Sequence, residues 1–465
     1  SLAKRGVHMV RLHLQIDGHD PDDPDAINRA LLARVHMLAA ACKESGIYLT
    51  LSPYWTNSAR KHFPEAWRDE LGGENTHGLL FFHPWLQARY KNWIRRFLSA
   101  ENPHTGLALK DDPVLGIFQV QNEDSLLFWT QRSLTPEQAT ILGRQYADWL
   151  VEKYGSLDGA YEAWDGVRIE EGKGTGNLGD RPDEGVMAVY IVWEMTQDHS
   201  GGMARRLADQ TEFFARVMYQ WNEEVERFVH EDLDCPVLVN AGNWKTASNE
   251  KLLAAERWSY TANEVLAVNR YFGGIHIGPQ SGWRVKAGHR FVPRSVIRNP
   301  HLLPHNLRQL NGCPMLITET TWTVPNPYIA EGPLLSAAYQ SLTGVDGTYW
   351  FAIGTPTFQE PIGNIFFIGH PCLMGQFPAA ALMYRRGDVT EGPPALVEER
   401  TLEQVWDRQA PVLPEGAGFD PSRDVADTTL GGPAESGVHP LAYLVGRVET
   451  RFVEGDPRIE TAELE

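Results

Sequence analysis

The chain has 465 residues, of which 42% are hydrophobic and 22% are charged, and its formal net charge at pH 7 is −18. This length suits one large α/β domain with an appendage, and the apolar content excludes a largely disordered chain. The acidic charge argues against nucleic acid and anionic membranes as partners, because both attract clustered lysine and arginine. No apolar run reaches the roughly 20 residues that cross a bilayer, so we expect no membrane span.

Apolar runs alternate with helical stretches, which predicts βα units around a parallel sheet. We expect strands at 7–14, 47–54, 114–122, 237–242, 265–272, 315–320 and 347–353. We expect helices at about 26–45, 84–100, 135–153, 203–232 and 379–384. A (β/α)8 TIM barrel needs eight strands. Because the chain opens in what reads as the tail of a helix, we expect the first barrel strand to be missing. A seven-stranded open sheet is the alternative.

The predicted organisation is a barrel over residues 1–385 and a C-terminal appendage of mixed strands and loops over 386–465. An insertion at about 130–234, after the fourth barrel strand, is far longer than an ordinary loop. Long loops at the C-terminal face of a barrel usually shape its binding site. The appendage is rich in proline, glycine and acidic residues, and 442–448 reads as a short strand.

Two glutamates, Glu123 and Glu319, each follow an apolar run. A parallel barrel gathers the C-terminal ends of its strands around one pocket, so the two carboxylates can face each other there. Such a pair is the minimal machinery for breaking a glycosidic bond. Burial beside an apolar strand suits Glu123 to general acid catalysis, although a salt-bridged surface glutamate is the alternative.

A nucleophilic Glu319 must stay ionised and therefore needs donors. Arg11 lies in an apolar strand and demands an anion, and Tyr271 can donate its phenol to the same carboxylate. A structural ion pair and a core-edge tyrosine are the alternatives for these two residues. The amide of Asn122 can hold a sugar hydroxyl. His13 shares a strand face with Arg11 and is either a substrate ligand or a structural histidine.

Aromatic residues cluster near the predicted strand ends. Flat indole faces stack on the C–H faces of sugars, although any single tryptophan is more often part of the core. The candidates are Trp55, Trp129, Trp244, Trp322 and Trp350. Residues 174–179 match the glycine pattern of dinucleotide sites, but no strand precedes them and no helix follows. The histidines lack the spacing of metal ligands, so we expect neither a cofactor nor a metal.

Asn122-Glu123 and Glu319 resemble the acid/base and nucleophile motifs of glycoside hydrolase clan A, the TIM-barrel group that includes families 5, 35 and 42. Arg11, Tyr271 and Trp350 match that clan more loosely. Residues 147–155, continued by 160–164, are similar to the segment that follows the acid/base strand in family 42 β-galactosidases. The resemblance covers roughly residues 5–385.

The resemblance implies a retaining hydrolase in which Glu123 is the acid/base and Glu319 the nucleophile, with carboxyl groups about 5–5.5 Å apart. Asn269 stands where family 5 enzymes usually carry histidine, and we expect it to contact the substrate. The expected partner is a β-linked glycan or oligosaccharide, with β-galactosidase-like activity preferred. An endo-acting cellulase or mannanase, a non-catalytic carbohydrate-binding barrel and a lyase are the alternatives. The sequence indicates neither the localisation nor the oligomeric state.

Overall fold

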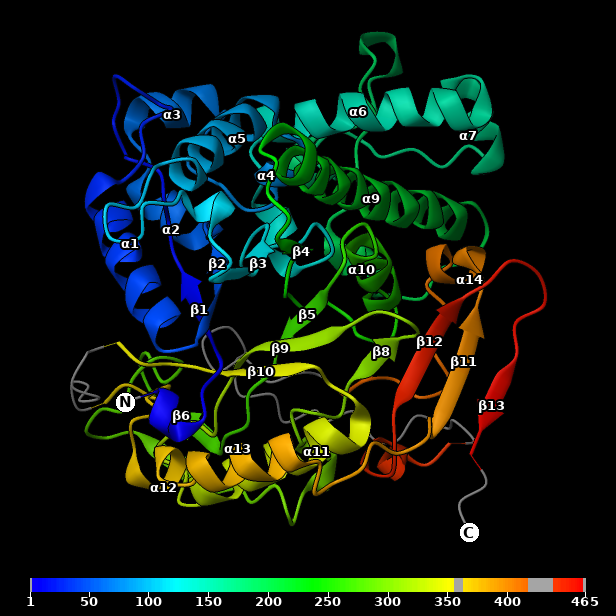
Figure 1. The fold of residues 1–465 in the computed structure, drawn as a ribbon. Coiled ribbons are helices and arrows are strands. Elements are labelled where there is room, and N and C mark those ends of the chain that lie inside the picture. Colours follow the sequence, from blue (N-terminus) through cyan, green and yellow to red (C-terminus); the bar gives the residue numbers. More distant parts are fainter. Residues whose placement is uncertain (1, 355–362, 417–437, 463–465) are drawn as a thin grey trace. The chain divides into compact units, whose positions relative to one another are not determined.

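The computed structural model describes residues 2–354, 363–416 and 438–462 (Figure 1). The chain divides into two compact units, which we name after the glutamates they hold. The Glu123 unit comprises residues 11–266 and 403–409, and the Glu319 unit comprises 1–10, 267–402 and 410–465. Among the described residues, no helix is long and apolar enough to cross a membrane.

The Glu123 unit is built on a four-stranded sheet with the order β1-β2-β3-β4. These strands are β1 (Met9–His13), β2 (Tyr48–Ser52), β3 (Leu115–Gln119) and β4 (Leu238–Asn240). The neighbours of β3 on both sides run parallel to it. Consecutive residues of β2, such as Thr50 and Leu51, are both buried. Covered on both faces, such strands read in the sequence as continuous apolar runs.

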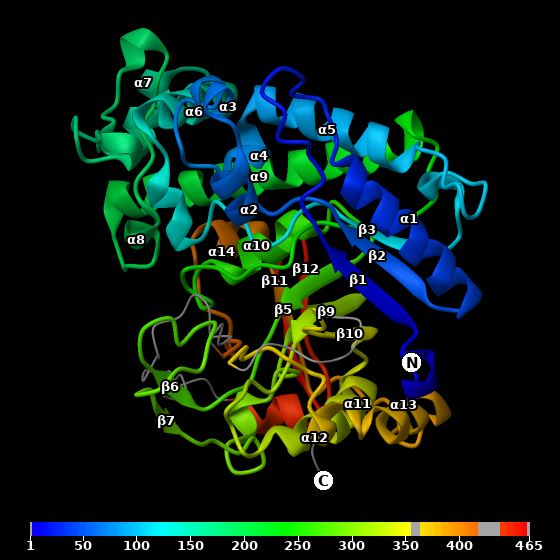
Figure 2. The same ribbon diagram turned by 90° about the vertical axis from the view of Figure 1, so that its left-hand side faces the viewer.

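Helices that follow the strands cover this sheet. They are α1 (Arg29–Glu44), α2 (Thr56–His62), α3 (Glu65–Glu70), α4 (Leu79–Phe82) and α5 (Pro84–Leu98). Helix α1 begins where the Asn28 side chain accepts a hydrogen bond from the Leu31 amide at 2.9 Å. It ends before Gly46, whose φ of +67° suits glycine. Figure 2 shows α1 beside the strands of the sheet.

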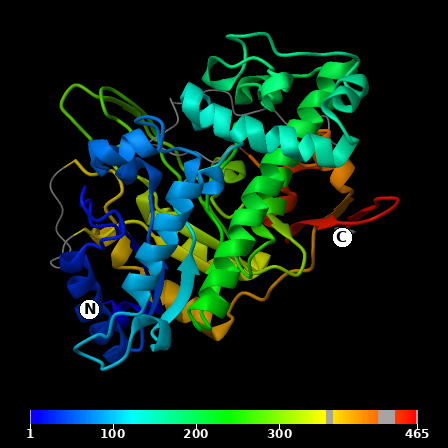
Figure 3. The same ribbon diagram turned by 90° about the horizontal axis from the view of Figure 1, so that it is seen from above.

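The predicted insertion between β3 and β4 consists of helices and loops. It contains α6 (Pro136–Tyr154), α7 (Leu157–Ala163), α8 (Val192–Met195) and α9 (Gly201–Arg227), which a π-helical turn (Phe228–Asp232) extends. Thr135 and Gln138 form a capping box at the start of α6. Helices α6 and α9 cross (Figure 3), and Tyr146 packs on Phe213 with ring centroids 4.8 Å apart. Helix α9 also packs on α10 (Leu253–Tyr260).

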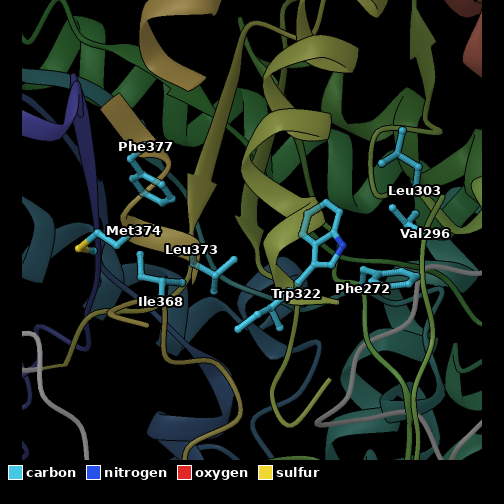
Figure 4. Close-up of a cluster of buried hydrophobic side chains, with 9 residues drawn as sticks. Phe272, Val296, Leu303, Trp322, Ile368, Leu373, Met374 and Phe377 are labelled. Atoms are coloured by element: carbon cyan, nitrogen blue, oxygen red, sulfur yellow. The ribbon is translucent and has the colours of Figure 1, made fainter. Parts of the chain in front are cut away.

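The Glu319 unit contains a three-stranded sheet with the order β10-β9-β5. Its strands are β5 (Leu266–Asn269), β9 (Met315–Thr320) and β10 (Gly347–Trp350). Strands β9 and β10 are parallel, and α11 (Gly332–Thr343) connects them. Helix α13 (Phe377–Arg386) packs beside α11 (Figure 1). Figure 4 shows the aromatic and aliphatic core of this unit, in which Trp322 and Phe377 meet α12 (Pro371–Met374).

A second sheet in this unit has the order β13-β11-β12-β8. The strands are β8 (Arg308–Leu310), β11 (Leu396–Arg400), β12 (Val448–Phe452) and β13 (Ile459–Thr461). Its edge strand β8 therefore comes from the segment assigned to the barrel. The strand prediction for 442–448 was wrong, because Pro440–Leu444 form a 3-10 helix that the His439 side chain caps. The boundary at residue 385 stays a prediction.

All seven strands predicted for the barrel are present, and β9 matches its predicted range residue for residue. The other six are shorter than predicted at one or both ends. A hairpin of β6 (Ile275–Ile277) and β7 (Arg290–Val292) was not predicted. It is visible in Figure 2.

Candidate active site

Glu123 lies in the loop that leaves the C-terminal end of β3. The Asn122 amide donates to the Tyr54 carbonyl at 3.0 Å, which ties this loop to the chain that follows β2. The Gln121 amide donates to the Ala241 carbonyl at 3.3 Å, which ties it to the chain that follows β4. Glu123 is 7% exposed and has a φ of +51°. Non-glycine residues seldom adopt this left-handed conformation, which is enriched at functional sites.

Two polar side chains hold the Asn122-Glu123 pair, one from β1 and one from the loop after β4. Arg11 donates from Nη2 to Asn122 Oδ1 at 2.6 Å and from Nε to Gln119 Oε1 at 2.7 Å. Asn243 Nδ2 donates to the same Asn122 oxygen at 3.0 Å. In turn, Asn243 Oδ1 accepts from the Glu123 amide at 2.9 Å. This chain of contacts fixes both the amide plane of Asn122 and the backbone of Glu123.

Asn243 was missed from the sequence, because it stands between a glycine and a tryptophan without a motif of its own. Arg11, which we expected to serve Glu319, donates to Asn122 beside the other glutamate. A contact between Arg11 and Glu319 stays a prediction.

His13 and Trp55 come from the ends of the neighbouring strands β1 and β2. Their rings meet edge to face with centroids 4.9 Å apart. Burial, reinforced by the charge of Arg11, lowers the pKa of His13 to about 3. The imidazole is therefore neutral at ordinary pH and can both donate to and accept from a hydroxyl. The Trp55 amide donates to Gln15 Oε1 at 2.9 Å, which holds the half-buried indole in place.

The two remaining tryptophan candidates of this unit have different surroundings. Trp244 is 1% exposed and packs edge to face on Phe128, with centroids 5.1 Å apart. Its ring therefore lies in the core. Trp129 is half-buried and lies 6.1 Å from Trp193, measured between ring centroids. Trp193 is 54% exposed and was missed, because α8 is a single turn inside a long loop.

Glu319 is the last residue but one of β9 and is 4% exposed. The Tyr271 phenol donates to Glu319 Oε2 at 2.5 Å, which confirms the contact predicted for these residues. Phe351 and Phe366 pack against the Tyr271 ring, with centroids at 6.4 Å and 5.2 Å. These rings fix the phenol in the direction of the carboxylate.

Asn269 lies on β5, beside the strand that carries Glu319. Its Oδ1 accepts a hydrogen bond from the Thr318 hydroxyl at 2.9 Å, and the residue is buried. This bond orients the amide plane of Asn269. The proposed contact of Asn269 with substrate stays a prediction.

Trp322 and Trp350 stack on each other with ring centroids 5.8 Å apart. Trp322 is completely buried within the core that Figure 4 shows. Its faces contact Trp350 and Phe272, so this indole lies in the core like Trp244. Half-buried Trp350 packs against the same core. As platforms for sugar, Trp55, Trp129 and Trp350 are therefore better suited than the two buried tryptophans.

The described residues contain no group of three or more His, Cys, Asp or Glu side chains arranged to hold a metal ion. The side chains that contact one another beside the two glutamates are carboxylates, amides, a guanidinium and a phenol. Each glutamate follows or ends a strand that runs parallel to its neighbour.

Comparison with known proteins relates this chain to glycoside hydrolases. No family model matches it. It is similar to mannan endo-1,4-beta-mannosidase 3 of Oryza sativa subsp. japonica, with 28% identity over 127 residues, which are 26% of this chain and 27% of the relative. Mannan endo-1,4-beta-mannosidase 4 of the same organism is 27% identical over 127 residues, 26% of this chain and 28% of its own. The aligned segment thus spans about a quarter of either relative.

Among solved structures, the chain is similar to the beta-galactosidase from the psychrophilic Marinomonas ef1. The TM-score is 0.52 at 12% identity, and the match covers 87% of this chain and 61% of that chain. At this identity the similarity shows the fold, which is that of the TIM-barrel glycosidases. The predicted α/β barrel class and the resemblance to clan A are therefore confirmed.

Proposed function

We propose that this protein is a retaining glycoside hydrolase of β-linked glycans, with Glu319 as nucleophile and Glu123 as acid/base. The hydrogen bond from Tyr271 to Glu319 carries the proposal. A donor aimed at a carboxylate oxygen fixes the direction of that oxygen, and a nucleophile must be held in a defined direction toward the atom it attacks. The position of both glutamates at strand ends in a barrel fold further supports it, because TIM-barrel enzymes carry their catalytic groups there.

In the proposed reaction, one oxygen of Glu319 attacks the anomeric carbon while the bond to the leaving oxygen breaks. Glu123 gives its proton to that oxygen, and a glycosyl ester of Glu319 remains. In the second step, Glu123 takes a proton from water, the water oxygen bonds to the anomeric carbon, and the ester bond breaks. The sugar leaves with its original β configuration.

Asn122 is suited to hold the substrate next to Glu123. Its Oδ1 accepts hydrogen bonds from Arg11 and Asn243, so the amide plane is set before any ligand arrives. The Nδ2 group remains the donor that a sugar hydroxyl can use. Neutral His13 adds a second polar group, and Trp55 offers an aromatic face to the same ligand.

Two substrate classes compete within this proposal. The sequence favours a β-galactoside, whereas the two relatives aligned over 127 residues are named as mannan endo-1,4-beta-mannosidases. The exposed Trp193 beside Trp129 could support a further unit of a longer glycan, which agrees better with an endo-acting enzyme.

A substrate panel tests the proposal: aryl β-galactoside, aryl β-mannoside, β-1,4-mannan and a cello-oligosaccharide, each with Glu319→Ala as blank. Release of β-anomer, followed by NMR during the first minutes, supports a retaining hydrolase. Shortening of mannan with release of new oligosaccharides favours an endo-acting mannanase over a β-galactosidase. Oligosaccharide binding without cleavage identifies a non-catalytic barrel, and products that absorb in the ultraviolet identify a lyase. Initial release of α-anomer contradicts the retaining mechanism.

A further inference from the structure

A buried carboxylate on α10 joins the two loops that carry the Glu123 site. Glu256 is 0% exposed. Its Oε2 accepts a hydrogen bond from the Ser125 hydroxyl at 2.5 Å, and its Oε1 accepts one from the Tyr260 phenol at 2.7 Å. Ser125 is two residues beyond Glu123, in the loop after β3. The phenol of Tyr260 reaches the loop after β4.

Each of these two hydroxyl groups accepts a hydrogen bond from a backbone N–H and donates its own hydrogen bond to Glu256. The Leu127 amide donates to Ser125 Oγ at 2.9 Å, and the Trp244 amide donates to the Tyr260 oxygen at 3.1 Å. A hydroxyl has one proton, so each of these groups directs that proton to the carboxylate. Two chains of donors thus start at the backbone of two loops and end on one acceptor.

The same two loops meet directly at the proposed acid/base. The Glu123 amide donates to Asn243 Oδ1, and Asn243 immediately precedes Trp244. Gly242 packs so closely that a Cβ there would lie 3.0 Å from the Tyr260 oxygen. A shift of either loop therefore changes the position of Glu123 relative to Asn243.

We propose that Glu256, in its ionised form, is a positioning residue that holds the loops after β3 and β4 together and so orients Glu123. It acts through Ser125 and Tyr260 and does not itself contact the substrate. This inference rests on the proposed function for the role of Glu123. The junction between the loops can be tested independently of that function.

The charge state of Glu256 gives this junction a pH dependence. Burial raises the pKa of Glu256 to about 7 and the Asp124 carboxylate adds to this rise, whereas Ser125, Tyr260 and the Arg257 guanidinium oppose it. From α9, the Met218 sulfur faces this cluster, 3.8 Å from Ser125 Oγ. Protonation of Glu256 places an O–H donor on one of its two carboxyl oxygens. That oxygen then faces the hydroxyl of Ser125 or Tyr260 as a second donor, so one of the two hydrogen bonds to Glu256 must break.

Glu256→Gln tests the proposal, because it keeps the shape and replaces one acceptor by an amide donor. Misplacement of a catalytic group by about 1 Å costs up to about 100-fold, so we expect kcat to fall between about 10- and 100-fold. KM for an aryl glycoside that the parent cleaves should stay within about twofold, because no substrate contact is removed. The limb of the parent pH profile near 7 should disappear.

The matched control is Glu226→Gln on α9. Burial also raises the pKa of this carboxyl, and Asn263 Nδ2 donates to it at 3.0 Å. Among the described residues, its hydrogen-bond partners, Asn263 and Glu264, lie outside both loops. This control should keep the parent kcat and pH profile. Should Glu256→Gln fail to fold, Ser125→Ala and Tyr260→Phe take its place in every assay. Each of these variants removes one of the two hydrogen-bond chains that end on Glu256.

Hydrogen exchange supplies a readout that needs no substrate. The Leu127 and Trp244 amides should exchange faster in Glu256→Gln at fixed pH, and at the parent rate in Glu226→Gln. Unchanged exchange at both amides would show that Glu256 does not hold the two loops together. Faster exchange combined with the parent kcat and pH profile would show that the junction does not orient Glu123. A parent that cleaves nothing in the panel refutes the proposed function instead, while the exchange rates still decide whether Glu256 joins the loops.

Discussion

The two glutamates have surroundings of different kinds. At Glu123, an amide side chain fixes the backbone and a guanidinium fixes the neighbouring Asn122. At Glu319, a phenol contacts the carboxylate itself. The contacts at Glu123 therefore fix the position of its backbone and of the neighbouring amide, whereas the contact at Glu319 fixes the direction of a carboxylate oxygen. The two glutamates are thus held at different points, one through the backbone and one through the side chain.

The largest expected effect is that of Glu319→Ala. Without a nucleophile the first step fails, and kcat should fall on the order of 10⁴-fold or more, as for removal of other nucleophiles. Azide can fill the vacated space and attack the anomeric carbon, so it should restore turnover with an α-glycosyl azide as product. Product identification by NMR checks this. An α-azide formed instead by a Glu123 variant would reverse the two assigned roles.

Glu123→Ala should be damaging in a way that depends on the leaving group. General acid catalysis contributes about 10²–10⁴-fold, and only poor leaving groups need it in the first step. The loss in kcat/KM should therefore be large for an alkyl or sugar leaving group and small for a dinitrophenyl glycoside. A series of aryl glycosides measures the slope. Equal losses across that series would remove Glu123 from the acid role.

Tyr271→Phe removes the phenol that donates to Glu319 Oε2. Loss of one such preorganised hydrogen bond costs about 10²–10³-fold in kcat. The matched control is Tyr443→Phe, another buried phenol of the same unit, which donates to the Leu413 carbonyl at 3.3 Å. Steady-state kinetics of both variants give the comparison, and equal kcat values for the two would show that the phenol on Glu319 has no special role.

The smallest effect concerns stability. Because the pKa of Glu256 is raised from 4.5 to about 7, the folded chain keeps this proton over a range where the unfolded chain has lost it. The free energy of unfolding should therefore be highest below the unfolded value and fall as pH rises through 7. Glutamine does not titrate, so Glu256→Gln should lack this loss. The difference in unfolding free energy, variant minus parent, should therefore rise between pH 5 and pH 8 by up to about 3 kcal/mol. Urea unfolding at both pH values measures this rise, and a pH-independent difference would contradict it.

The apolar runs identified the strands of the barrel because strands such as β3 and β9 bury consecutive residues, and such runs are visible without tertiary information. The sheet that contains β8 and β12 was missed because its pairing is remote in sequence. Strand β8 pairs with a segment about 140 positions later, Arg308 with Val448. Near residue 442, Pro440 and the His439 cap favour a 3-10 turn over the strand that the apolar residues indicated.

The two glutamates of the candidate site were predictable, because a glutamate that follows an apolar run is recognisable from the sequence alone. Their supports were less visible. Asn243 has no motif, and Glu256 lies in a helix beside Arg257, where two charges in sequence resemble a solvated face although both residues are buried. Tyr260, one turn beyond Glu256, was the available signal for a buried carboxylate. The partner Ser125 lies 131 positions away.

The left-handed backbone of Glu123 has an evolutionary consequence. A residue with a Cβ costs roughly 1–2 kcal/mol in that conformation, a cost that glycine avoids. Replacement by glycine would therefore remove the proposed acid and relieve strain in the same step. Under the proposed function, a descendant that binds sugar without turnover therefore lies one substitution away, and that substitution relieves the backbone strain at this position.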